Sequence, residues 1–170
     1  GGMNGIEVHD STNVRLENVS ISESKMDGIQ ARRSSVTIKG CSIRLHGEYT
    51  QAIDLSFAFD LPMSRVERCT VVGGQEGIVS HMSHVDFRRN HVRETTLRAI
   101  TVSEMSMGMV RQNVVEDALG VVPLLGRHVQ VGERARRGDV AGRALERLLV
   151  EPPRALAVVA LVLVEPPELG

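Results

Sequence analysis

One short phrase recurs through the first 121 residues, and its period constrains the fold more than any other feature. The phrase is a small residue followed by a branched apolar residue, and its six copies start 23, 24, 25, 22 and 21 residues apart. The copies open at Gly5-Ile6, Gly28-Ile29, Ala52-Ile53, Gly77-Ile78, Ala99-Ile100 and Gly120-Val121. Repeats of this length are typical of a solenoid, in which each unit contacts only its neighbours.

Each repeat also contains a second apolar pattern with the spaced alternation of β-strands. Turn-forming runs such as Asp10–Asn13 and Val72–Gln75 separate the strand patterns and leave no room for crossover helices. In the first three repeats the pattern comprises Val14, Leu16, Val19, Ile21, Val36, Ile38, Cys41, Ile43, Val66, Cys69 and Val71; in the next two it comprises Val85, Phe87, Val92, Val110, Asn113 and Val115. The chain has neither the leucine ladder of leucine-rich repeats nor the spacing of helical repeats. We therefore predict an all-β parallel β-helix of about five coils over residues 1–121, with strands stacked about 4.8 Å apart.

The repeats resemble those of the right-handed parallel β-helix family, the pectate-lyase-like superfold. Besides the opening phrase and the apolar ladder, the resemblance rests on Arg-Arg-Asn-His-Val at 88–92 and Arg-Gln-Asn-Val-Val at 111–115. It covers residues 5 to about 122. The superfold hosts lyases, hydrolases, epimerases, phage tailspikes, copper-site maturation factors and many bacterial proteins, so it implies the fold more specifically than an activity. It also implies a secreted or cell-envelope protein, although this chain shows no signal-peptide pattern. The uncapped start leads us to expect a fragment of a longer solenoid.

The composition of the chain limits the classes of partner that it is expected to bind. The net charge of -1 gives no basic excess for nucleic acid, and we expect no nucleic-acid partner. Tryptophan is absent and Tyr49 is the only tyrosine, so few aromatic faces are present for stacking sugars. The apolar run Leu156–Val164 of the tail has nine residues and is too short to span a membrane. No motif indicates a cofactor.

Polar and sulfur-containing residues also recur at one inward position. Cys41 and Cys69 occupy the same place in neighbouring coils and are expected to stack as free thiols in the core. Stacked neighbours are also close enough for a disulfide, which the sequence leaves open. Asn90 and Asn113 occupy the matching place in later coils, where an inward asparagine ladder is expected.

The last fifty residues have a different composition. From Val121 onward only ten residue types occur, and Ser, Thr, Asn, Ile and Met are among those that vanish. Residues 122–170 are therefore a low-complexity Ala/Arg/Val/Leu/Pro tail, irregular or partly helical, with a short helix expected at Val140–Val150 that Pro152-Pro153 would end. Three interpretations remain open: a cap on the last coil, a disordered or partner-binding extension, or a frameshift in a GC-rich gene.

Strand parity places candidate chemistry on the outer face. Since Ile6 and Val8 point inward, Glu7 and His9 point outward, and the same parity applies to every coil. One outward column then contains Glu7, Gln30, Asp54, Val79 and Thr101, and the next contains His9, Arg32, Ser56, His81 and Ser103.

Asp54, Arg32 and His81 form the catalytic candidate within these columns. A carboxylate beside a guanidinium is expected to stay ionised, and a neighbouring histidine can move protons near neutral pH. The trio could supply the base, acid and charge neutraliser of a lyase or epimerase acting on a polysaccharide that contains uronate. Glu7, His9, Gln30, Ser56, Thr101 and Ser103 are the expected substrate-binding residues.

Other functions compete with this one. Glycoside hydrolysis uses two carboxylates, and on its column Asp54 has only Glu7, two coils away; the aspartate motifs of pectate lyases and polygalacturonases are also missing. A non-catalytic structural or interaction module of the cell envelope is therefore the rival hypothesis. A third is copper handling through His81, Met82, His84 and Met105, since imidazole and thioether groups suit Cu(I). Asp86 is expected to be a loop or surface residue.

Overall fold

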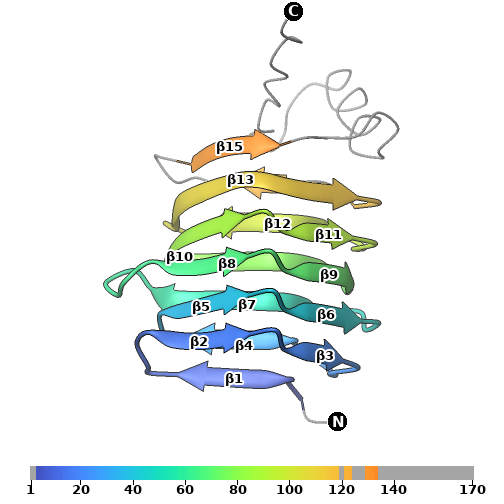
Figure 1. The fold of residues 1–170 in the computed structure, drawn as a ribbon, viewed down its shortest axis with the longest axis horizontal. Helices are drawn as coiled ribbons and strands as arrows, with labels where there is room; N and C mark the ends of the chain where they lie inside the picture. Colours follow the sequence, from blue (N-terminus) through green and yellow to red (C-terminus); the bar gives the residue numbers. More distant parts are fainter. Residues whose placement is uncertain (1–2, 119–120, 124–128, 134–170) are drawn as a thin grey trace, which may run out of the picture.

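The computed structural model of this chain describes residues 3–118, 121–123 and 129–133, and every regular element in them is a β-strand. The strands pair in parallel and wind into a solenoid, whose coils stack from β1 to β15 in Figure 1. The predicted all-β parallel solenoid is confirmed. The helix expected at Val140–Val150 and the apolar run Leu156–Val164 lie outside the described residues.

Three sheets form the faces of the solenoid. Sheet A contains β1 (Ile6–His9), β4 (Ile29–Arg32), β7 (Gln51–Ala58), the first part of β10 (Glu76–Arg88), β12 (Arg98–Ser103) and β14 (Val121–Pro123). Sheet B contains β2 (Val14–Glu17), β5 (Val36–Lys39), β8 (Ser64–Glu67), the second part of β10, the first part of β13 (Met107–Glu116) and β15 (Val129–Glu133). Sheet C contains β3 (Ser20–Ser22), β6 (Ser42–Leu45), β9 (Thr70–Gly73), β11 (His91–Arg93) and the end of β13.

The register of the sheets follows the sequence period. The branched residues of the opening phrase pair from coil to coil: Ile6, Ile29, Ile53, Ile78, Ile100 and Val121. The fifth coil aligns through Val110 and Val115, which pair with Phe87 and Val92. Strands β14 and β15 add backbone pairs beyond residue 121, so the stack continues past the boundary expected from composition.

Each coil has three strands because the second apolar pattern bends in its middle. The wider gap between Leu16 and Val19 is a corner between sheets B and C, and one residue per coil there has a positive φ of 54 to 63°. These left-handed residues are Asn18, Gly40, Arg68, Arg89 and Gln112. This wider gap in the apolar alternation is therefore the feature of the sequence that indicates a third strand in each coil and a third face of the solenoid.

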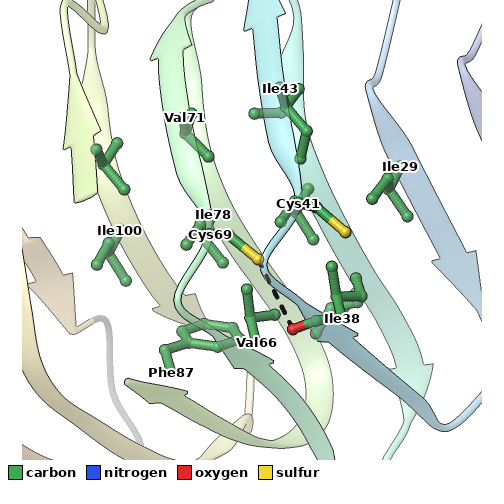
Figure 2. Close-up of a cluster of buried hydrophobic side chains, with 14 of the residues drawn as sticks. Ile29, Ile38, Cys41, Ile43, Val66, Cys69, Val71, Ile78, Phe87 and Ile100 are labelled. Carbon is green, nitrogen blue, oxygen red and sulfur yellow. Dashed lines mark hydrogen bonds between the residues drawn. The ribbon is translucent and has the colours of Figure 1, made fainter. Parts of the chain in front are cut away.

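Apolar side chains from all three sheets fill the interior of the coils (Figure 2). The small residue of each opening phrase is required at the corner between sheets C and A. A Cβ at Gly28 would lie 2.6 Å from Ile43 Cγ2 and the same distance from the Ala52 carbonyl oxygen, and Gly77 is equally crowded by Val92. The small residue therefore recurs because neighbouring side chains and backbone pack closely at this corner.

The inward cysteines and asparagines form one polar column. Both thiols are buried and free, so the disulfide left open by the sequence is absent, and burial raises the pKa of Cys69 to about 12. Asn90 Nδ2 donates to Asn113 Oδ1 at 3.0 Å and to the Val66 carbonyl at 3.0 Å, while Asn90 Oδ1 accepts from the Cys69 amide. The predicted asparagine ladder is confirmed.

A second buried polar column lies at the corner between sheets A and B. Ser83 Oγ accepts from the Ala58 amide at 3.2 Å, and Ser106 Oγ accepts from the Ser83 amide at 3.2 Å. Ser64 and Ser34 play the same part in earlier coils by accepting from the amides of Val36 and Ser11. Backbone groups left unpaired by the bends are thus satisfied by side chains from adjacent coils.

Replacing Asn90 by alanine tests the ladder. Asn90→Ala leaves the Val66 carbonyl and the Cys69 amide without their buried side-chain partner, so we expect the free energy of unfolding to fall by about 2 to 4 kcal/mol. Denaturant unfolding measures it. Thr70→Ala, an exposed change beside Cys69, is the control and should cost less than about 0.5 kcal/mol. Equal losses in the two variants would contradict a special role for the ladder.

Candidate functional site

A hollow of about 280 Å³ opens on the outer face of sheet A. The sheet register brings Gln30 beside Asp54 and Ser56 between Arg32 and His81, as the outward columns predict. The lining residues come from β4, β7 and β10 and from the corner after β12: Gln30, Arg32, Gln51, Asp54, Ser56, Phe57, His81 and Glu104. The three predicted catalytic residues therefore share one pocket.

Asp54 is the most perturbed group in the pocket. Its side chain is buried, its Oδ1 has no hydrogen-bond partner, and its Oδ2 is 3.4 Å from the Ser56 hydroxyl. Burial, and then the negative charge of Asp27, raise the pKa of Asp54 to about 6, against an opposing effect of His81. A carboxyl with this pKa can take or release a proton close to neutral pH.

Arg32 does not keep Asp54 ionised, and this correction changes the site. No ion pair joins the two side chains in the described part of the chain; the Arg32 guanidinium carbon instead lies 5.1 Å from the centre of the Phe57 ring. Arg32 is exposed, and Phe57 is 47% exposed. A stacked, solvent-facing guanidinium keeps its donors available for an anionic group on a ligand.

His81 is held by two neighbours from the next coil. Its Nδ1 is 2.8 Å from Ser103 Oγ and 3.7 Å from Glu104 Oε2. Ser103 Oγ also lies 3.1 Å from the Ser80 carbonyl oxygen, which can only accept. Because a hydroxyl has one proton, Ser103 gives it to Ser80 and accepts from Nδ1–H, which leaves Nε2 as the acceptor of the neutral ring.

A second carboxylate near Asp54 was missed by the sequence analysis. Asp27 is buried, accepts from the Gln51 amide at 3.1 Å and from Gln30 Nε2 at 3.2 Å, and burial raises its pKa. Its negative charge also raises the pKa of Asp54. The available signal was the polar column before each small residue: Asn4, Asp27, Gln51, Glu76 and Arg98. Phe57 and Glu104 were also missed, because they occupy corners rather than strand columns.

The remaining predicted substrate residues divide into exposed and buried groups. Glu7 and His9 are exposed, lie 3.5 Å apart as a pair, and do not line the pocket. Ser56 is buried but lines the pocket, whereas Thr101 and Ser103 are buried outside it. An outward position on the strand therefore does not make Ser56, Thr101 and Ser103 exposed. Strands lie only about 4.8 Å apart, so side chains of the neighbouring columns cover these short ones.

The four copper candidates have separate surroundings. His84 packs against the Phe59 ring with centroids 4.5 Å apart, and Met105 is 62% exposed. His81 bonds Ser103, and Met82 occupies a left-handed corner. In the ranges that the structure describes, no three or more His, Cys, Asp or Glu side chains are grouped so that they could hold a metal ion.

Comparison with protein families agrees with the coil architecture and the register described above. The family model of the right-handed β-helix region matches residues 1–130. This chain belongs to the right-handed β-helix family. The match confirms the resemblance and the handedness expected from it, and it extends beyond residue 122. Comparisons with curated proteins and with solved structures gave no significant match. Within the described part of this β-helix, no helix has the length and apolar character to cross a membrane.

The raised pKa of Asp54 makes stability depend on pH. Since the folded state holds this proton more tightly than the unfolded chain, stability is highest below pH 4 with respect to this group and is lost as the pH rises through about 6. Asp54→Asn removes that loss, so we expect the variant to be more stable than the wild type at pH 7.5, by on the order of 2 kcal/mol. Thermal unfolding from pH 4.5 to 7.5 measures the difference.

Asp10→Asn is the matched control for that measurement. Asp10 is exposed and pairs with Arg33, which lowers its pKa, so its removal should not stabilise the protein at neutral pH. A wild-type pH profile that Asp54→Asn leaves unchanged would show that Asp54 ionises normally in the fold.

Proposed function

We propose that the sheet A pocket binds an acidic polysaccharide and moves a proton on one of its uronate residues, as lyases and epimerases do. The observation that carries this proposal is Asp54, a buried carboxyl with an unpartnered oxygen and a pKa of about 6, in a pocket that also holds His81. Groups with perturbed pKa values that meet in a pocket are typical of proton-transfer sites.

The chemistry follows from the positions of the charged groups. Ionised Asp54 takes the proton from the sugar carbon next to the carboxylate, and Arg32 binds that carboxylate and offsets the charge that builds up on it. In a lyase the electron pair left on the carbon forms a carbon–carbon double bond and the neighbouring glycosidic C–O bond breaks. His81, after taking a proton from water on Nε2, then protonates the departing oxygen. In an epimerase a proton returns to the same carbon from the opposite face.

The open, strand-lined shape of the pocket suits a polymer better than a small metabolite. Its residues come from four successive coils, so an extended sugar chain that follows the solenoid axis can contact several of them at once. Exposed Phe57 provides an apolar surface for one sugar ring, which partly offsets the shortage of aromatic residues. A secreted or cell-envelope location is proposed on the same basis, since such polysaccharides are found there.

A non-catalytic structural module is the second candidate. The observation that favours it is the fully buried Val79 next to Asp54, because this apolar side chain interrupts the polar column along which a sugar chain would lie. In a module of this kind, the two buried polar columns at the corners stiffen the solenoid, and the pocket binds no substrate.

Incubation with a panel of uronate polysaccharides tests the proposed function. Ultraviolet absorbance of unsaturated ends detects a lyase, and deuterium uptake from heavy water at the acidic carbon detects an epimerase. We expect Asp54→Asn to lower the rate at least about a hundredfold, with Asp10→Asn unchanged. The wild-type rate should increase as the pH rises through about 6, because Asp54 must be ionised to act as the base. No activity with any substrate, together with no glycan binding, would favour the structural module.

A further inference from the structure

The outer face of sheet B carries a concentration of positive charge that the sheet A pocket does not use. Two outward columns of the sheet and the following corner form this surface, which we call the sheet B strip. Its charged members are Arg15, Glu17, Lys39, Arg65, Glu67, Arg68, Asp86, Arg88, Arg89 and Arg111. Seven of them are basic and three acidic, although the whole chain has a net charge of -1. The positive charge is therefore local to this face.

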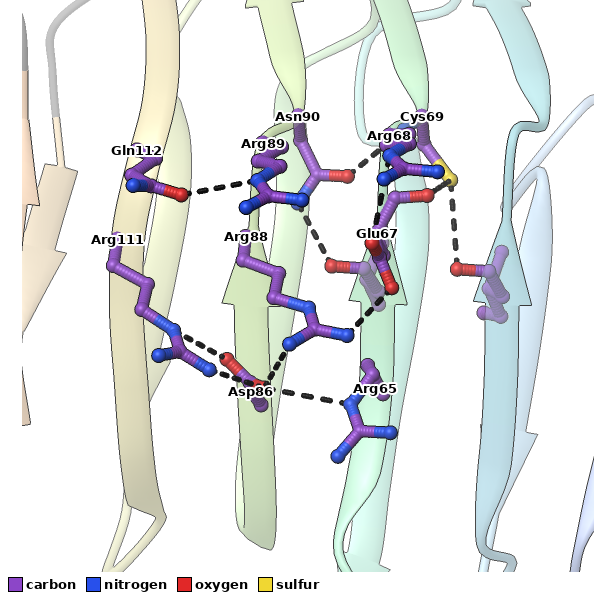
Figure 3. A network of polar contacts seen from close by, with 12 residues as sticks. Arg65, Glu67, Arg68, Cys69, Asp86, Arg88, Arg89, Asn90, Arg111 and Gln112 are labelled. Atoms are coloured by element: carbon purple, nitrogen blue, oxygen red, sulfur yellow. Dashed lines mark hydrogen bonds and ion pairs between the residues drawn. The ribbon is translucent and has the colours of Figure 1, made fainter.

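Two carboxylates hold four of the arginines of the strip in place (Figure 3). Asp86, which sequence analysis expected at the surface, is buried and lies 3.1 Å from Arg111 Nη2 and 3.4 Å from Arg65 Nε. Glu67 lies 2.7 Å from Arg88 Nη2 and 3.5 Å from Arg68 Nε. Guanidinium groups fixed in this way lose less side-chain entropy when they bind a ligand.

The carboxylates do not use up the donor capacity of these arginines. Each guanidinium has five N–H donors, and Arg65 donates to Asp86 through Nε at 3.4 Å. Side chains of Arg65, Arg68 and Arg111 are 38%, 56% and 42% exposed. Donors and surplus charge therefore face outward at steps of about 4.8 Å along the axis.

We propose that the sheet B strip binds a linear anionic glycan, sulfated or carboxylated, at a site separate from the sheet A pocket. Charged groups repeated along such a polymer can contact guanidinium groups from three successive coils, which lie in β8, β10 and β13. Single-stranded nucleic acid fits the strip less well, because none of its columns contains an aromatic side chain on which a base could stack. A sheet face also does not enter the major groove of duplex DNA as a helix or a two-stranded ribbon does. The proposal does not depend on catalysis in the pocket.

The test is binding of heparin, a sulfated glycan, and of a polyuronate by the full chain at low and moderate salt. Arg68→Gln/Arg89→Gln removes two exposed charges at corner positions with φ of 54 and 55°, and Gln112 occupies the same corner in the next coil with φ of 56°. Glutamine is thus compatible with the backbone there, and thermal unfolding should be unchanged. We expect affinity for the bound glycan to fall about tenfold at low salt and to depend less steeply on salt.

Arg44→Gln/Arg93→Gln is the matched control, because it removes the same charge from sheet C. It should change affinity by less than about twofold. Both double variants keep every residue that lines the sheet A pocket, so a difference in affinity between them reports on the strip and not on the pocket. No glycan binding at low salt, equal losses in the two double variants, or tighter binding of duplex DNA than of either glycan would overturn the proposal.

Discussion

Parallel backbone hydrogen bonding between successive coils is the constraint on which the rest of the structure depends. A single coil buries too few apolar side chains to offset the entropy of ordering its backbone, so each coil is stable only when paired with its neighbours. Pairing in one register then places equivalent residues in columns, such as the isoleucines of sheet A and the paired asparagines of the corner. A repeat in the sequence thereby becomes a line of like groups along the molecule.

The pairing of coils in one register also explains the raised pKa of Asp54 in the sheet A pocket. A flat parallel sheet brings side chains of adjacent coils to about 4.8 Å of one another, so a short carboxyl in the middle of a column is covered by longer neighbours. Asp54 is buried in this way, and Asp27 adds a like charge, so burial and repulsion both disfavour the charged form and raise the pKa of Asp54. On sheet B the outcome is opposite, because Arg88 beside Glu67 lowers the pKa of that carboxyl. Neighbours in adjacent coils therefore shift the pKa values of Asp54 and Glu67 in opposite directions.

Sequence periodicity predicted the backbone and the columns but not the contacts between side chains. The phase of Ile6, Ile29 and Ile53 fixed which residues pair, and the matching positions of Asn90 and Asn113 predicted their hydrogen bond. The partner of Arg32 could not be predicted, because its long side chain reaches a corner residue, Phe57, instead of its strand neighbour. The alternation in the sequence reports only which face of a strand a residue occupies. It does not predict side-chain rotamers or the contacts that are made at corners.

The most direct test of the central claim is a carbon-13 NMR titration of the Asp54 side-chain carboxyl, assigned by comparison with Asp54→Asn. Burial beside Asp27 predicts a midpoint near pH 6, well above that of exposed Asp10, whose pairing with Arg33 lowers its pKa. A midpoint for Asp54 at or below the ordinary value for an aspartate would show that the carboxyl is solvated or paired, and would contradict a proton-transfer site in the sheet A pocket.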